Sequence, residues 1–195
     1  DMGSMFNEAA SFNQDLRCWS VSTASVPANF RINAPVHMKS PNFGSGPGSC
    51  IIPPAQTPIT IADSTAFVTT WKITANGESL ILPLSGPGYN FTVDWGDGTL
   101  PDTIVSAVAS HTYVSAGEYH VTMTGVIPSF GYQGSCTSDG GRSRLIDIKQ
   151  WGTNVWQSLG FCKATNLRVS ALDGPNLTGT LNLSEFFYHA HHFNS

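Results

Sequence analysis

The sequence predicts a mainly β protein that is built partly from internal repeats. Charged residues make up only 11% of the 195 residues, against about 25% in an ordinary soluble protein. Their place is taken by 22 Ser and 18 Thr, with 19 Gly and 12 Pro. Many β-branched residues between frequent turn formers favour strands over helices. The second observation is a motif that occurs near both ends of the chain, which is typical of repeat architectures.

The composition excludes several functional classes. Lys and Arg total 9 and the formal net charge is −4, so we expect no nucleic-acid partner, which would require a basic stripe. No apolar run approaches the roughly 18–20 residues that cross a bilayer, so we expect no membrane span. Hydrophobic residues at 41% argue against full disorder. The chain begins at Asp1 without a signal peptide, and we expect a processed product or part of something longer.

The repeated motif reads [Met/Phe]-Phe-x-x-Ala-x-x-Phe-Asn. One copy spans Met5–Asn13, another spans Phe186–Asn194, and a weaker copy spans Phe161–Leu167. The three anchors of the weaker copy each precede those of the last copy by 26 residues. A shared offset at three positions indicates a true repeat.

The first copy predicts one structural unit. Met5, Ala9 and Phe12 are spaced i, i+4, i+7, which places them on one face of a short helix. A strand-like segment follows at Leu16–Ser22. A unit of one helical turn and one strand cannot bury its apolar face alone, so it must stack on other copies.

These residues resemble a known family. Phe12–Ser22, which reads Phe-Asn-Gln-Asp-Leu-x-x-Trp-x-Val-Ser and follows Met-Phe-x-x-Ala, resembles the BspA-like repeat, a leucine-rich-repeat relative found in cell-surface proteins. The resemblance covers residues 1–34 and about 145–195. It implies that one array ends near residue 34 and that another begins near residue 145. Each half-array then has an open stacking face that can meet a neighbouring subunit.

Between the two arrays we expect a connector and a separate β domain. Residues 35–62 are rich in Pro, Gly and Ser, which predicts an extended linker. From about residue 66 the pattern alternates: Phe91, Val93 and Trp95 face one way, and the residues between them face the other. Tyr119, Val121 and Met123 also alternate inward.

A further motif identifies the middle domain by resemblance. Trp95-Gly96-Asp97-Gly98-Thr99 contains Asp-Gly, which is a tight-turn signal. It precedes His111-Thr-Tyr113 and Gly117-x-Tyr119-x-Val, and in this order the three motifs resemble a PKD domain. The resemblance implies an immunoglobulin-like β-sandwich that acts as a spacer or adhesion module and carries no catalytic residues. The expected structural motif is therefore Trp95, Gly96, Asp97, Gly98, His111, Tyr113, Gly117 and Tyr119.

Two clusters of potential metal ligands have simpler interpretations, which we favour. Asp94, Asp97 and Asp102 can in principle bind Ca²⁺ through carboxylate oxygens, but Asp97 can equally cap its own turn. His189, His191 and His192 can hold a transition metal, but they occupy variable, outward positions of the repeat. We therefore predict no metal site. No Gly-x-Ser-x-Gly elbow and no paired carboxylates for glycoside cleavage are evident, so we expect no enzyme.

Three sequons are candidates for N-glycosylation: Asn90, Asn176 and Asn182. Asn90 falls on the outward face of its predicted strand, next to Thr92, which makes it the favoured site. The alternative is unmodified asparagine at all three positions.

The four cysteines, Cys18, Cys50, Cys136 and Cys162, form no Cys-x-x-Cys pair, so their spacing does not suggest zinc. Two disulfides in an extracellular chain are one interpretation, and four reduced thiols are the other. Of the three possible pairings we favour Cys18–Cys50 with Cys136–Cys162, and a bond between neighbouring subunits remains an alternative.

Together these observations predict an immunoglobulin-like, PKD-like β-sandwich flanked by partial solenoid repeats. The expected segments are 1–34 (end of an array), 35–62 (linker), 63–142 (sandwich) and 143–195 (start of an array). The expected function is an extracellular structural protein that assembles head to tail into a glycosylated cell-surface filament. The alternative is a fragment of an adhesin that binds host or matrix glycans or proteins. The residues predicted to form the assembly faces are Met5, Phe6, Phe12, Trp19, Phe187 and Phe193.

Overall fold

The computed structural model describes residues 63–132, 141–179, 183 and 186, and the backbone of residues 20–21 and 42–43. These residues form a mainly β fold, as the sequence predicts. In chain order the elements are β1 (Ser20–Val21), β2 (Asn42–Phe43), β3 (Phe67–Ile73), β4 (Ser79–Ile81), β5 (Asn90–Asp94), β6 (Asp102–Ile104), β7 (Ser110–Thr112), β8 (Gly117–Val126), β9 (Ser129–Tyr132), the 3₁₀ turn η1 (Arg142–Arg144), β10 (Leu145–Gln150), β11 (Ser158–Phe161), β12 (Arg168–Val169) and β13 (Asn176–Leu177).

One layer is a six-stranded sheet with the strand order β12-β10-β3-β8-β5-β6. Its centre is the antiparallel pair β3 and β8, in register from Phe67 opposite Met123 to Ile73 opposite Gly117. In β5 the side chains of Phe91 and Val93 are buried while those between and beside them are exposed. The alternation that the sequence predicts for this strand is therefore confirmed.

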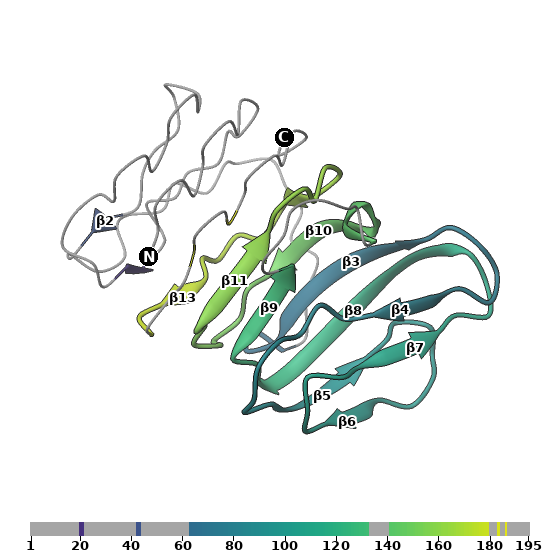
Figure 1. Cartoon of the computed structure of the whole chain (residues 1–195), viewed down its shortest axis with the longest axis horizontal. Helices are drawn as coiled ribbons and strands as arrows, with labels where there is room; N and C mark the ends of the chain where they lie inside the picture. Colours follow the sequence, from purple (N-terminus) through teal and green to yellow (C-terminus); the bar gives the residue numbers. More distant parts are fainter. Residues whose placement is uncertain are drawn as a thin grey trace.

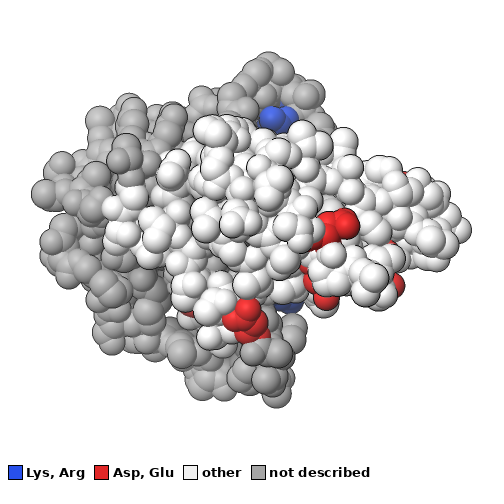
Figure 2. All heavy atoms as spheres, turned by 90° about the horizontal axis from the view of Figure 1, so that it is seen from below, with Lys and Arg blue, Asp and Glu red and all other residues white. Residues whose placement is uncertain are grey.

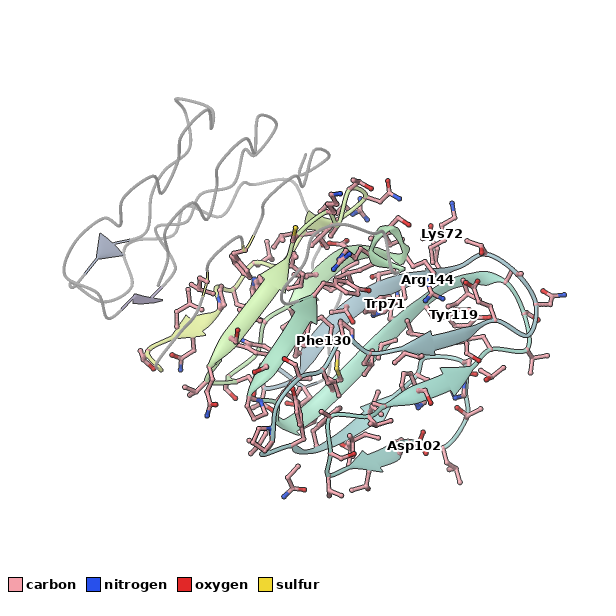
Figure 3. The ribbon with its side chains drawn as sticks, viewed as in Figure 1. Trp71, Lys72, Asp102, Tyr119, Phe130 and Arg144 are labelled. Carbon is pink, nitrogen blue, oxygen red and sulfur yellow. The ribbon has the colours of Figure 1, made fainter. Side chains whose placement is uncertain are left out.

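The second layer consists of the pairs β4–β7 and β9–β11, which lie in front of the six-stranded sheet in Figure 1. The hydrophobic core fills the space between the layers, with Leu80 from β4 and Phe91 from β5 among its buried members. Trp71 of β3 and Phe130 of β9 meet across it, with ring centroids 6.5 Å apart (Figure 3). Two packed layers around one core fit an immunoglobulin-like sandwich.

The six-stranded sheet continues into the C-terminal part of the chain. β10 pairs antiparallel with β3, with Leu145 opposite Trp71. Aromatic packing follows the same route: the ring of Phe67 lies 5.8 Å from Trp151 and 4.8 Å from Trp156, centroid to centroid. Residues of the expected sandwich and of the expected second array therefore share one sheet and one hydrophobic core.

A second feature is a series of parallel pairings at a regular spacing. β10 pairs with β12 so that Asp147 lies opposite Arg168, 21 residues further along. Val155 bridges to Asn176 with the same spacing. Parallel neighbours at a constant interval are what stacked repeats produce.

This parallel ladder also joins the two ends of the described chain. β13 pairs with β1, with Asn176 opposite Ser20, and β1 pairs with β2, with Ser20 opposite Asn42. β2 lies inside the segment expected to be an unpaired linker. Pro41 precedes this strand, and because proline removes only its own backbone donor, Asn42 and Phe43 can still pair.

The helical interpretation of the weaker repeat copy is wrong. Phe161 ends strand β11, and tight turns follow, in which Ala164 N donates to Phe161 O at 3.0 Å and Leu167 N donates to Ala164 O at 3.1 Å. Lys163 adopts a positive φ of 56°, which a right-handed helix does not allow. The three anchors Phe161, Ala164 and Leu167 are nevertheless fully buried, so the pattern marked burial correctly.

Candidate functional site

The motif residues of the middle domain gather at one end of the sandwich, around the turn after β5. His111 from β7 stacks on the indole of Trp95, with centroids 5.1 Å apart. The Nε2 atom of His111 lies 2.7 Å from Asp97 Oδ2. The turn requires Gly96 because φ is +79° there, and a Cβ would approach the carbonyl oxygen of His120 to 2.3 Å.

Hydrogen bonds fix the electrostatics of this turn. Partial burial raises the pKa of the Asp97 carboxyl, but hydrogen bonds from Thr99 and His111 outweigh that effect and lower the pKa to about 2. Thr99 donates both its backbone N–H, at 3.1 Å, and its hydroxyl, at 2.7 Å, to Asp97 Oδ1. Asp97 is therefore an ionised cap of its own turn.

Two tyrosines complete the cluster. The Tyr113 hydroxyl donates to the carbonyl of Trp95 at 2.9 Å, and burial raises the pKa of this phenol well above its usual range. The Tyr119 ring, from β8, lies 4.2 Å from that of Tyr113. Gly117 at the start of β8 contacts the Tyr119 ring, where an added Cβ would lie 3.4 Å from Cε2. These contacts tie β5, β7 and β8 together, which is a structural role.

The three aspartates near the turn are each engaged separately. Asp94 Oδ1 accepts the Gly96 N–H at 2.9 Å, and Asp102 Oδ2 accepts the Trp95 indole N–H at 2.7 Å (Figure 3 labels Asp102). Among the described residues, no group of three or more His, Cys, Asp or Glu side chains is placed to hold a metal ion. The arrangement thus gives calcium no shared carboxylate site within that part of the chain.

The sequons differ in their surroundings. Asn90 is exposed on β5, opposite Val126 of β8. Asn176 is partly buried in the parallel ladder, and its Oδ1 accepts both the N–H and the hydroxyl of Thr178, at 3.2 and 2.7 Å. Asn182 lies outside the described residues.

Several predicted residues cannot be placed. Met5, Phe6, Phe12, Trp19, Phe187 and Phe193 lie outside the described residues, as do His189, His191 and His192. Cys18, Cys50 and Cys136 do as well. Cys162 is buried and bonded in a disulfide whose partner is not among the described residues. The pairing of Cys136 with Cys162 stays a prediction.

The junction between β10 and β12 contains an ionic group that we did not predict. Asp147 is fully buried, and its Oδ2 lies 2.7 Å from Lys149 Nζ and 2.8 Å from Arg168 Nε. Ser170 donates its N–H at 3.0 Å and its hydroxyl at 2.9 Å to the same carboxylate. The available signal was an acidic residue between two isoleucines in a chain with few charges. A buried carboxylate held from two parallel strands fixes their register.

A second polar contact joins the start of the C-terminal segment to the sandwich. Arg144 Nη1 lies 2.8 Å from Glu78 Oε1 and donates to the carbonyl of Ser79 at 3.0 Å (Figure 3 labels Arg144). The contact connects η1 with the loop before β4. It adds to the shared sheet in holding the two segments together.

The described surface carries little charge. In Figure 2 a few acidic groups interrupt a face made mostly of uncharged residues. Large apolar side chains stand exposed in the loops beside β6 and β7, among them Leu100, Val105 and Val108. Within the described part of the chain there is no helix long and apolar enough to cross a membrane.

Comparison with known families agrees with the middle of the chain. Residues 56–126 match the PKD domain family, and this range contains the cluster around Trp95, His111 and Tyr113. PKD domains are common in extracellular surface proteins and adhesins. The matching segment is thus a PKD domain with an immunoglobulin-like sandwich, whereas the BspA-like resemblance of the flanking segments stays a prediction. No curated protein and no solved structure matches the chain.

Proposed function

We propose that this chain is an extracellular structural protein, a subunit or repeat unit of a head-to-tail surface filament. The observation that carries the proposal is the parallel ladder in which β13, from the C-terminal segment, pairs with β1, from the N-terminal segment. Stacked repeats leave an apolar face and unpaired backbone groups at each open end, which favours association with further copies. Contacts of this kind do not close on themselves and therefore give fibres.

The first experiment is the dependence of particle size on protein concentration, followed by electron microscopy. Head-to-tail assembly predicts filaments whose axial repeat matches one copy of the chain. Replacing Phe6 and Phe12 with Asp should abolish them, because both belong to the predicted N-terminal assembly face. The matched control replaces Val105 and Val108, exposed in sandwich loops, with Asp and should leave the filaments intact. Filaments that survive the Phe6 and Phe12 change would contradict the assigned face.

The second candidate is a cell-surface adhesin fragment that binds host or matrix glycans or proteins. The match of residues 56–126 to the PKD domain family favours it, because such domains are common in adhesins. It predicts dispersed particles whose size does not change with concentration. It also predicts saturable binding to immobilised glycans or matrix proteins, which the filament proposal does not require.

We further propose that the chain is N-glycosylated, with Asn90 as the preferred site. Support comes from the exposure of Asn90 on β5, whereas the Asn176 side chain is engaged by Thr178. Glycopeptide mass spectrometry of secreted protein from a host with the pathway should find higher occupancy at Asn90. Asn90→Gln should remove most of the glycan mass, and Asn176→Gln should remove less. Equal losses would contradict the preference.

In the same proposal the chain has no enzymatic activity. Support comes from the structural role of the titratable residues around Trp95, each of which is engaged in a turn or a strand contact. Turnover of ester, peptide or glycoside substrates by the purified chain would overturn this part.

A further inference from the structure

We propose that in the assembled filament the strand that pairs with β13 is the β1 strand of a neighbouring copy. The pairing described within one chain is then exchanged between chains without a change of register. This inference rests on the proposed filament and names the contact that joins its subunits: the edge of β13 in one copy and β1, with β2 beside it, in the next.

The register of the ladder is the first argument. The step from Val155 to Asn176 covers 21 residues of sequence, and the step from Ser20 to Asn42 covers 22. The step between them, from Asn176 to Ser20, joins residues 156 positions apart, with the whole sandwich between them in the sequence. β1 therefore takes the next place in the ladder although it is not the next segment of the chain.

Backbone pairing does not distinguish the chain that supplies the strand. The β13–β1 contact is a parallel ladder, whose main-chain N–H and C=O groups are the same in every copy. A β1 strand from a second copy can make the same hydrogen bonds at the same register. Exchange of an identical element between protomers is a low-cost route to association for this reason.

The length of the connection is the second argument. β2 ends at Phe43 and the described sandwich resumes at Asp63, so residues 44–62 join them. Twenty Cα–Cα steps reach about 65–70 Å when extended, and Pro47, Pro53, Pro54 and Pro58 favour extended chain. The ten-residue strand β8, the longest of the described sandwich, spans only about 33 Å. The connection is thus long enough to carry β1 and β2 to another molecule.

The concentration of copies decides between the two arrangements. Within one chain, β1 reaches its own β13 at an effective concentration of the order of millimolar for a flexible tether, and lower for a long one. Copies arranged in a filament present β13 edges at a fixed position next to each β1. Once a first contact forms, pairing between copies therefore competes with pairing within one chain.

A mixed cysteine experiment tests the exchange. One differently tagged chain carries Ser20→Cys and the other carries Asn176→Cys, and the two are refolded together and oxidised. Directly opposed residues on paired strands lie about 5 Å apart, within the Cα–Cα range of a disulfide. Because neither chain holds both cysteines, only contact between copies can give the mixed covalent dimer, which we expect as the main oxidised species. The double variant should give a ladder of covalent multimers.

Matched variants control for native thiols and for folding. Val155→Cys replaces Asn176→Cys in the control mixture, because Val155 lies one ladder step further from β1, and this mixture should give no mixed dimer. Each single variant alone sets the background from the native cysteines. A second register pair, Val21→Cys with Leu177→Cys, repeats the test in case a change at Asn176 prevents folding.

Electron microscopy of the same samples separates this inference from the proposed function. Filaments with the mixed dimer support both. Filaments in which the double variant yields only internally cross-linked monomer overturn strand exchange and leave the filament proposal standing. Dispersed particles with the internal cross-link overturn both. No specific cross-link at either register pair overturns the β13–β1 contact and the exchange with it.

Discussion

Replacing Trp151 with alanine tests whether the PKD domain and the C-terminal strands fold as one unit. Trp151 is fully buried just after β10. Its ring packs against Phe67 of β3 at 5.8 Å, against Trp156 at 6.4 Å and against Phe161 of β11 at 6.2 Å, all between centroids. The side chain therefore touches both the sandwich and the segment that follows it.

The structure sets the size of the effect. Truncation of a buried tryptophan to alanine costs about 3–5 kcal/mol, a large part of the roughly 5–15 kcal/mol by which a domain is stable. Since each 1.4 kcal/mol is a factor of ten, the slowest amides should exchange about 10²- to 10³-fold faster. If the core is shared, this acceleration appears in both β8 and β11. Hydrogen exchange read by mass spectrometry on peptides from the two strands measures it.

The control is Val155→Ala, an exposed position in the same segment, which should change exchange by less than about 0.5 kcal/mol equivalent. Accelerated exchange confined to residues 151–179, with β8 unchanged, would refute the reasoning. The sandwich and the C-terminal strands would then be separate cooperative units, despite the sheet that joins β10 to β3.

Three further predictions follow from individual contacts. The lowered pKa of Asp97 means that its contribution, of the order of 1 kcal/mol after solvent screening, is present above about pH 4 and is lost as the pH falls towards 2; Asp97→Asn should therefore destabilise at pH 7 and not at pH 2, measured by urea denaturation, and an equal difference at both would contradict this. Gly131→Ala should destabilise strongly, by more than about 3 kcal/mol, because φ is +110° and a Cβ would meet the Gly160 carbonyl at 1.9 Å; a change in melting temperature of only a few degrees would exclude the described β9–β11 pairing. Asp147→Ala should cost about 2–4 kcal/mol because it removes the acceptor that joins β10 to β12, whereas Arg168→Ala, at a more exposed partner, should cost less; the reverse order would argue against the buried carboxylate as the centre of the group.

The parts of the fold that the sequence predicted depend on short-range patterns. Alternation in β5 appears as alternating burial, and the inward positions Val121 and Met123 of β8 are buried. The Asp97-Gly98 signal marks a turn that is capped by its own aspartate. The anchor positions of the weaker repeat copy mark buried residues, but their helical spacing was misleading because Lys163 adopts a positive φ between them.

The tertiary structure alone decided how the segments combine. Neither the addition of β10 to the edge of β3 nor the meeting of β13 with β1 follows from any local pattern, because both depend on which strand edges remain free after the sandwich has formed. Asp147 reads as an ordinary surface charge until β12 brings Arg168 and Ser170 to it. By itself the sequence determined the composition of the surface, the strands and the turns, since these follow from neighbours in the chain. The shared core and the ladder that joins the two ends required three dimensions, because pairings between distant residues are selected by the free energy of the whole packed structure rather than by local preference.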